Sequence, residues 1–171
     1  LSLLKYIILP PYSDSPVHYQ IVLGFLHPDV SNNSKISLET ILSNYYHFGF
    51  HSLAAWLTSV VNLDPAKAIS LLGQLFLVLG PVSILFLTYT LTKDGASAMI
   101  AGLLAAMGWV MPAFAVNWGK FPALGALATM PSVLAFLWLY WHSRTKKNTS
   151  LFFGIVILVG ITLMHTRIIV C

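Results

Sequence analysis

A few polar side chains in this sequence have the types and positions that catalysis or ligand binding would need. Asp14 places a carboxylate four residues before His18, and a carboxylate can take a proton from a hydroxyl within hydrogen-bond reach. His165 and Arg167 lie two residues apart near the C-terminal end, where positive charge could stabilise a phosphate group. Trp118 lies in a short polar stretch, and its ring could stack on a sugar.

Each of these residues also has a structural explanation. A carboxylate at Asp14 would interact favourably with the N-terminus of a helix that starts nearby. His18 falls within the apolar arc of that helix, which favours a buried, hydrogen-bonded histidine over a metal ligand. Arg167 could extend to the lipid headgroups, His165 could ligate a pigment or haem in another kind of complex, and Trp118 suits the aromatic belt of a membrane.

His47 and His51 are spaced four residues apart, as zinc ligands on one helix face often are. No third ligand is evident, and Gly49 between them weakens the helix, so we expect a structural or interfacial pair and assign no metal ligands. The single cysteine, Cys171, excludes an internal disulfide and a cysteine-based metal site.

The composition predicts an integral membrane protein. Of the 171 residues, 57% are hydrophobic and only 8% are charged, and the mean hydropathy is +0.81. A soluble domain carries about 25% charged residues, so a soluble enzyme and a disordered chain are excluded. The net charge of +4 does not indicate nucleic-acid binding, because the basic residues are scattered or flank apolar segments.

Four segments are long and apolar enough to cross a bilayer of about 30 Å. They are residues 66–91, 96–116, 121–141 and 151–170, and we expect them to form a four-helix bundle over residues 66–171. The loop 142–150 holds Arg144, Lys146 and Lys147 and is therefore placed in the cytoplasm. Because successive connections between spans lie on alternate sides of the membrane, Trp118, Lys120 and the segment before residue 66 are then outside the cell.

The first 65 residues differ in kind, because they hold four of the five acidic residues. We expect residues 1–9 to end a preceding transmembrane helix of a longer chain, and residues 10–65 to form an extracytoplasmic loop with two interfacial helices. The first runs over residues 16–26 with Ser15 as its N-cap. The second begins near residue 37, is interrupted at Gly49 and ends near residue 63, where Asp64 and Pro65 open the first long span. A tilted span over residues 45–63 is the alternative.

Three stretches resemble the N-terminal half of GT-C superfamily glycosyltransferases, which are polytopic membrane enzymes. They are Pro10-Pro11-Tyr12-Ser13-Asp14-Ser15-Pro16-Val17-His18, residues 46–55 and residues 117–124 with Met130-Pro131. The resemblance extends over nearly the whole chain, and the order of the elements carries more of it than any single motif. It implies an all-α integral membrane fold.

The resemblance further implies transfer of a sugar from a polyprenyl-phosphate donor at the outer face of the plasma membrane. Asp14 occupies the place of the family's catalytic acid. We further expect His18, His165, Arg167 and Trp118 to bind the substrate, with Arg167 and His165 toward the donor phosphate. The family's acid can also help to hold a divalent metal, but no second acid adjoins Asp14. The alternative function is a non-catalytic transmembrane subunit of a respiratory or photosynthetic complex, with other membrane subunits as its partners.

Overall fold

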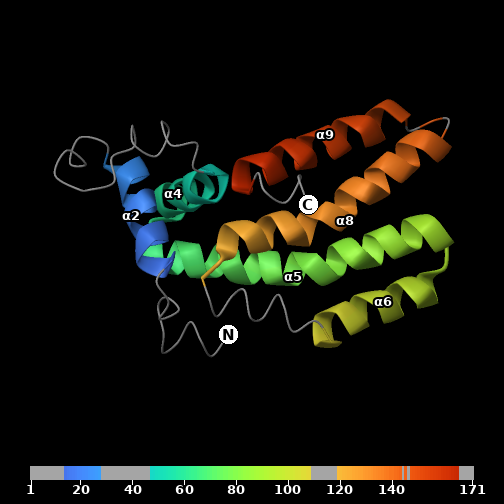
Figure 1. The fold of residues 1–171 in the computed structure, drawn as a ribbon, viewed down its shortest axis with the longest axis horizontal. Helices are drawn as coiled ribbons and strands as arrows, with labels where there is room; N and C mark the ends of the chain where they lie inside the picture. The colour runs from blue at the N-terminus through green and yellow to red at the C-terminus, as the bar shows by residue number, and fades with distance from the viewer. Residues whose placement is uncertain (1–13, 28–46, 109–118, 144, 146, 166–171) are drawn as a thin grey trace.

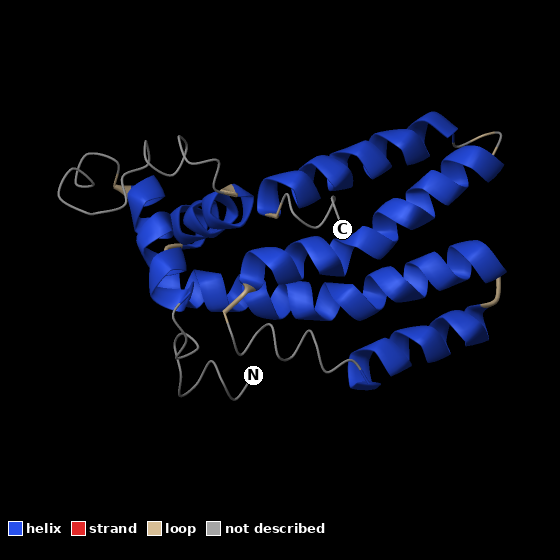
Figure 2. Ribbon diagram, viewed as in Figure 1, coloured by secondary structure: helices blue, strands red, loops and turns tan. Residues whose placement is uncertain are grey.

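The computed structural model describes residues 14–27, 47–108, 119–143, 145 and 147–165. Every regular element in these ranges is an α-helix (Figure 2). The described helices are α2 (Asp14–Leu26), α4 (Gly49–Val61), α5 (Pro65–Thr92), α6 (Gly95–Gly108), α8 (Phe121–His142) and α9 (Lys147–Met164).

Three of the described helices, α5, α8 and α9, are long and apolar enough to cross a membrane. They contain 28, 22 and 18 residues, which at about 1.5 Å per residue gives roughly 42, 33 and 27 Å. They run side by side, and α6 packs along α5 (Figure 1). These lengths and the large apolar side chains exposed on α5 and α9 are those of a multi-pass membrane protein.

The observed helices agree with the predicted spans at α5 and α8, and the last predicted span begins earlier than expected. The segment predicted over residues 96–116 is helical over Gly95–Gly108, and the rest of it lies outside the described residues. The last span begins at Lys147 instead of residue 151, which shortens the predicted loop 142–150. Asp64 caps α5 as predicted, because its Oδ1 accepts a hydrogen bond of 2.9 Å from the backbone N–H of Ala66.

The first short helix corrects one prediction. α2 begins at Asp14, so Ser15 lies inside the helix and is not its N-cap. A proline is tolerated in the first turn of a helix, and Pro16 therefore does not mark the start. The stretch predicted before Gly49, from residue 37 to residue 46, and the segment 1–9 lie outside the described residues, and α4 covers Gly49–Val61.

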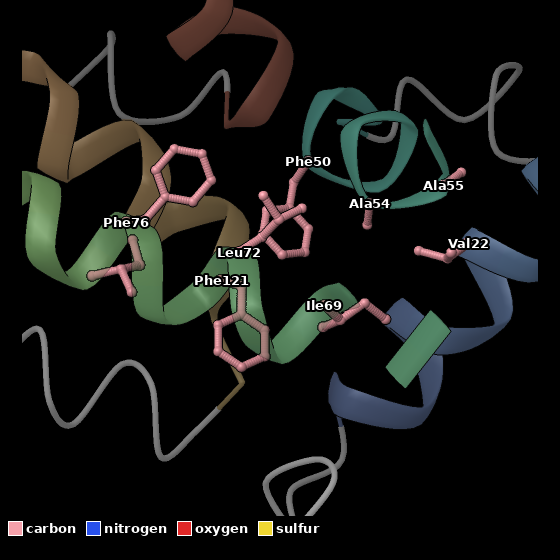
Figure 3. Close-up of a cluster of buried hydrophobic side chains, with 9 residues drawn as sticks. Val22, Phe50, Ala54, Ala55, Ile69, Leu72, Phe76 and Phe121 are labelled. Carbon is pink, nitrogen blue, oxygen red and sulfur yellow. The ribbon is translucent and has the colours of Figure 1, made fainter. Parts of the chain in front are cut away.

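The short helices α2 and α4 lie at one end of the long helices, where α5 and α8 begin and α9 ends (Figure 1). A cluster of buried apolar side chains joins them to α5 and α8 (Figure 3). Phe50 of α4 stacks on Phe121 of α8, with ring centroids 5.9 Å apart and an interplanar angle of 15°. The cluster consists of Val22, Phe50, Ala54, Ala55, Ile69, Leu72, Phe76, Phe121 and Leu124.

The opposite end of the bundle carries exposed polar and aromatic groups. Trp138 stacks on His142 at a centroid distance of 3.8 Å, and Trp141 is exposed. Asp94, between α5 and α6, accepts a hydrogen bond of 2.9 Å from the backbone N–H of Ser97. Hydrogen bonds from Ser97 and Ala96 to the carboxylate hold the pKa of Asp94 below its usual value. Aromatic residues at helix ends are typical of a membrane–water boundary.

Candidate functional site

A pocket lies at the end of the bundle that α2 and α4 cover. Its volume is about 160 Å³. Charged and imidazole side chains from four separate parts of the chain meet there, together with two small apolar residues of α8. The lining residues are Asp14, His18, His47, Lys120, Pro122, Ala123 and His165.

Helix α2 supplies Asp14 and His18 from one of its faces. The two residues are four apart, so they lie one above the other on the helix surface. Asp14 is the first residue of α2, where a carboxylate also interacts favourably with the helix dipole. His18 is buried, with 4% of its surface exposed, as the sequence predicted for a residue within the apolar arc.

His18 is held by a histidine from the other short helix. Its Nδ1 lies 2.8 Å from Nε2 of His51, and the ring centroids are 4.9 Å apart. Burial lowers the pKa of His18, while the negative charge of Asp14 and a backbone hydrogen bond with Gly119 raise it. Burial and the neighbouring His18 lower the pKa of His51 to about 3. Both rings are therefore predominantly neutral at neutral pH.

A second pair of histidines joins the residues just before α4 to the residue just after α9. The ring centroids of His47 and His165 lie 4.5 Å apart, at an interplanar angle of 38°. Gly49 makes this possible, because a Cβ at this position would lie 2.9 Å from the backbone carbonyl carbon of Leu163. The close approach of the two backbones brings the start of α4 against the end of α9.

The turn before α8 completes the pocket. Gly119 adopts a positive φ of 67°, and a Cβ there would lie 2.6 Å from Oγ of Ser15, so only glycine fits this turn without strain. Ser15 itself is buried, and its hydroxyl has no hydrogen-bond partner. Lys120, the next residue, lies at the N-cap position of α8. Its side chain makes no capping hydrogen bond to the helix.

The structure brings together part of the site expected from the sequence. Asp14, His18 and His165 all line the pocket, whereas Trp118 and Arg167 lie outside the described residues. The ring of His47 contacts that of His165, and the ring of His51 contacts that of His18, while the charge of His47 also acts on His51.

Sequence reasoning missed Lys120, which it treated only as a loop charge. The available signal was that Lys120 immediately precedes a span on the same expected side of the membrane as Asp14. Among the described residues, no three histidine, cysteine or acidic side chains are grouped to hold a metal ion.

In the described part of the chain every regular element is a helix, three helices are long and apolar enough to cross a membrane, and a polar pocket lies at one end of the bundle. These features define a multi-pass membrane protein. The chain belongs to a family of unknown function, DUF6541, whose model matches residues 12–171. Neither the curated proteins nor the solved structures contain a match to this chain. The family description names no activity, and the pocket is the described feature that bears on function.

Proposed function

We propose that this protein transfers a sugar from a polyprenyl-phosphate donor to an acceptor hydroxyl in the pocket between α2, α4, α8 and α9. The observation that carries the proposal is one pocket combining a carboxylate with a lysine ammonium group and imidazole rings. Glycosyl transfer needs both kinds of group. A base takes the proton of the acceptor, and positive charge or hydrogen-bond donors stabilise the departing phosphate.

Asp14 is the general base in this proposal. It is the one carboxylate that lines the pocket within the described part of the chain, and it is half-buried. The proton of the acceptor hydroxyl passes to an oxygen of Asp14 as the hydroxyl oxygen attacks the anomeric carbon. The bond between that carbon and the phosphate oxygen breaks, and the phosphate leaves with its lipid.

Lys120 and His165 form the phosphate side of the pocket. Lys120 provides a full positive charge, and its side chain is exposed, so a ligand can reach it. The helices α4 and α8 both begin near the pocket, and neither has a side-chain cap. The positive ends of their dipoles therefore favour a bound anion. Arg167, two residues beyond His165 in the sequence, lies outside the described residues, and its role toward the phosphate stays a prediction from the sequence.

The position of the pocket fits a lipid-linked donor. The pocket lies at one end of helices long enough to cross a bilayer, and the phosphate of a polyprenyl phosphate lies at the bilayer surface while its tail stays among the acyl chains. The basic residues of the loop 142–150 follow the opposite end of α8. Because basic residues are in excess in cytoplasmic loops, this charge distribution supports an extracytoplasmic position for the pocket in the proposal.

A transfer assay in nanodiscs, with a polyprenyl-phosphate hexose as donor, tests the role of Asp14. We expect Asp14→Asn to lower kcat by about 10²- to 10⁴-fold, the range for removal of a general base. The matched control is Asp94→Asn at the other end of the bundle, because asparagine also caps helices and Asp94 is exposed. Undiminished transfer by Asp14→Asn would remove Asp14 from the mechanism.

Binding of polyprenyl monophosphate, measured by native mass spectrometry, tests the phosphate side. We expect Lys120→Gln to weaken binding roughly tenfold or more, the loss typical of one hydrogen bond to a charged group. Lys67→Gln is the control, because Lys67 lies near the start of α5, is exposed and does not line the pocket. Equal weakening by both variants would show that only general surface charge matters. No binding by the wild type, with co-purification of other subunits in fixed ratio, would favour the non-catalytic subunit.

A further inference from the structure

The helices α5 and α8 run in parallel and keep one register. Phe121, the first residue of α8, lies against Gly73 of α5, because a Cβ added to Gly73 would be 2.3 Å from the phenyl ring. Further along both helices, Oγ of Ser132 donates a hydrogen bond of 3.0 Å to Oγ of Ser83. In these two pairs the α8 residue follows its α5 partner by 48 or 49 positions. The last residues of the two helices therefore lie at nearly the same level.

Because the two helices end together, the greater length of α5 lies at its start. α5 has 28 residues and α8 has 22, and residues 65–72 of α5 precede the contact of Gly73 with Phe121. At about 1.5 Å per residue, this extension is about 12 Å long. Its Ile69 and Leu72 belong to the buried cluster that includes side chains of α2 and α4 (Figure 3). The two short helices are therefore packed around the part of α5 that extends beyond α8.

Charged residues delimit a slab of α5 and α8 that is as thick as the core of a bilayer. α8 contains no acidic residue, lysine or arginine, and Lys120 immediately precedes it. α5 contains none between Lys67 and its end at Lys93, and the roughly 20 residues from Gly73 to Lys93 rise about 30 Å, the thickness of the hydrocarbon core. Lys67 lies in the extension and is exposed. Because charged side chains are costly in hydrocarbon, these positions favour a hydrocarbon boundary level with the start of α8.

Helix α4 lies across the bundle beside the start of α8, where Phe50 stacks on Phe121. In Figure 1 the long helices run across the view, whereas α4 is seen nearly end-on. α4 has 13 residues, too few to cross a bilayer, and none of them is an acid, a lysine or an arginine. One face is buried through Phe50 and Ala54, while Trp56 and Val60 are 59% and 62% exposed. These two residues are four apart and share an apolar face that the described part of the protein leaves uncovered.

We propose that the bilayer surface is the partner of this exposed face of α4. The hydrocarbon core ends level with Gly73 and Phe121, and Trp56 and Val60 lie in the boundary between the acyl chains and the headgroups. Tryptophan is enriched at this boundary. An uncharged apolar face beside the ends of membrane-capable helices also matches the boundary in polarity. The face of α4 therefore holds the short helices at a fixed depth on the bilayer.

The depth of the pocket follows from the same boundary. The first span expected from the sequence began at residue 66, whereas in this arrangement α5 enters the hydrocarbon only at Gly73. Residues 65–72 then lie among the headgroups, together with α2 and α4. Lys120 lines the pocket and directly precedes α8, so the pocket lies at the depth of the headgroups as well. This depth does not depend on whether the pocket transfers a sugar.

Spin labels at single cysteines measure the depth of α4, because Cys171 is the sole cysteine of the sequence and Cys171→Ser removes it. Val60→Cys is compared with Val78→Cys, since both valines are 62% exposed and Val78 lies on α5 past Gly73. Lys67→Cys labels the extension of α5. With the full chain in phospholipid nanodiscs, the ratio of collisions with oxygen to collisions with a nickel chelate rises with depth in the bilayer. We expect the highest ratio at residue 78, an intermediate ratio at residue 60 and the lowest at residue 67.

Any other order of the three ratios contradicts the proposal. Equal ratios at residues 60 and 78 would place α4 inside the hydrocarbon, and equal ratios at residues 60 and 67 would place it in water. A ratio at residue 67 as high as that at residue 78 would remove the boundary at Gly73. A label at residue 60 that collides with neither reagent would show that another protein covers the face, as expected for a subunit of a larger complex.

Tryptophan fluorescence gives an independent measurement if a cysteine variant fails to fold. The emission that Trp56→Phe removes belongs to Trp56, and lipids brominated near the headgroup should quench this component more than lipids brominated near the chain ends. Trp141→Phe is the matched control for the loss of one of five tryptophans, because Trp141 is 74% exposed at the opposite end of the bundle. Stronger quenching of the Trp56 component by the deep bromines, or none by either lipid, would overturn the proposal. Neither experiment needs sugar transfer, so a protein without transferase activity would leave the depth of α4 as proposed.

Discussion

Acidification should destabilise this protein through His51, and the size of the effect can be worked out from the structure. His51 has no exposed surface, and its pKa is lowered from 6.5 to about 3. In the unfolded chain the ring regains its ordinary pKa, so the unfolded state binds a proton at a higher pH than the folded state. The stability is fully present above pH 6.5 and is lost as the pH falls from there toward 3.

The magnitude follows from the difference between the two pKa values. At about 1.4 kcal/mol per pKa unit, the full loss below the folded pKa is about 5 kcal/mol, and the loss at about pH 5 is about 2 kcal/mol. His51→Gln removes the titrating ring and keeps a group that can accept from His18. Between about pH 7.5 and about pH 5, the wild type should therefore lose about 2 kcal/mol more of its unfolding free energy than this variant.

Unfolding followed by tryptophan fluorescence in a mild detergent, at both pH values, measures the difference. The readout is the pH dependence of the unfolding free energy and not its absolute value, so a general weakening of the variant does not affect the test. Gly95→Ala should show the pH dependence of the wild type, because it changes no titrating group and nothing lies within 4 Å of the added Cβ. An equal pH dependence in the wild type and His51→Gln would refute the assignment of a buried, neutral His51.

Two further substitutions test the packing that positions the pocket. Phe50→Ala should cost about 3–5 kcal/mol of unfolding free energy, because Phe50 is fully buried. Phe152→Ala should cost far less, since Phe152 is 61% exposed. Thermal unfolding of both variants measures the difference. Gly119→Ala should cost about 1–3 kcal/mol, because of its positive φ and its approach to Ser15. Gly95→Ala, where nothing lies within 4 Å, should change stability by less than about 0.5 kcal/mol, and a comparable loss in both glycine variants would contradict this reasoning.

The long helices could be predicted from the sequence because their signals are local. The Asp64-Pro65 dipeptide marks the start of α5 through a side-chain cap and a proline in the first turn, and the apolar runs define α5 and α8. The predicted start of α2 was wrong because Ser15 and Pro16 show the same pattern as Asp64 and Pro65, a capping residue followed by a proline. The helix begins at Asp14 instead, and the hydroxyl of Ser15 is buried against Gly119, a contact that no local pattern encodes.

The candidate site was only partly predictable, because its contacts join segments distant in sequence. His18 and His51 are 33 residues apart, and nothing in either segment indicates the other as its partner. The spacing of His47 and His51 indicated that these two residues lie near each other, as the effect of His47 on His51 bears out, but it gave no sign of the ring contacts with His165 and His18. The tertiary packing of α4 between α2 and α9 decides which histidines meet.

Three consecutive residues, Gly49 to His51, connect the pocket to the apolar cluster, and they separate chemical from structural effects. Gly49 lies against Leu163 of α9, Phe50 lies in the buried cluster, and His51 contacts His18 of α2. Because these contacts come from one turn of one helix, loss of packing at Phe50 also displaces both histidine contacts. Phe50→Ala should therefore reduce stability and pocket function together. A loss of function in Asp14→Asn without a loss of stability would instead identify chemistry, since Asp14 lies outside the cluster.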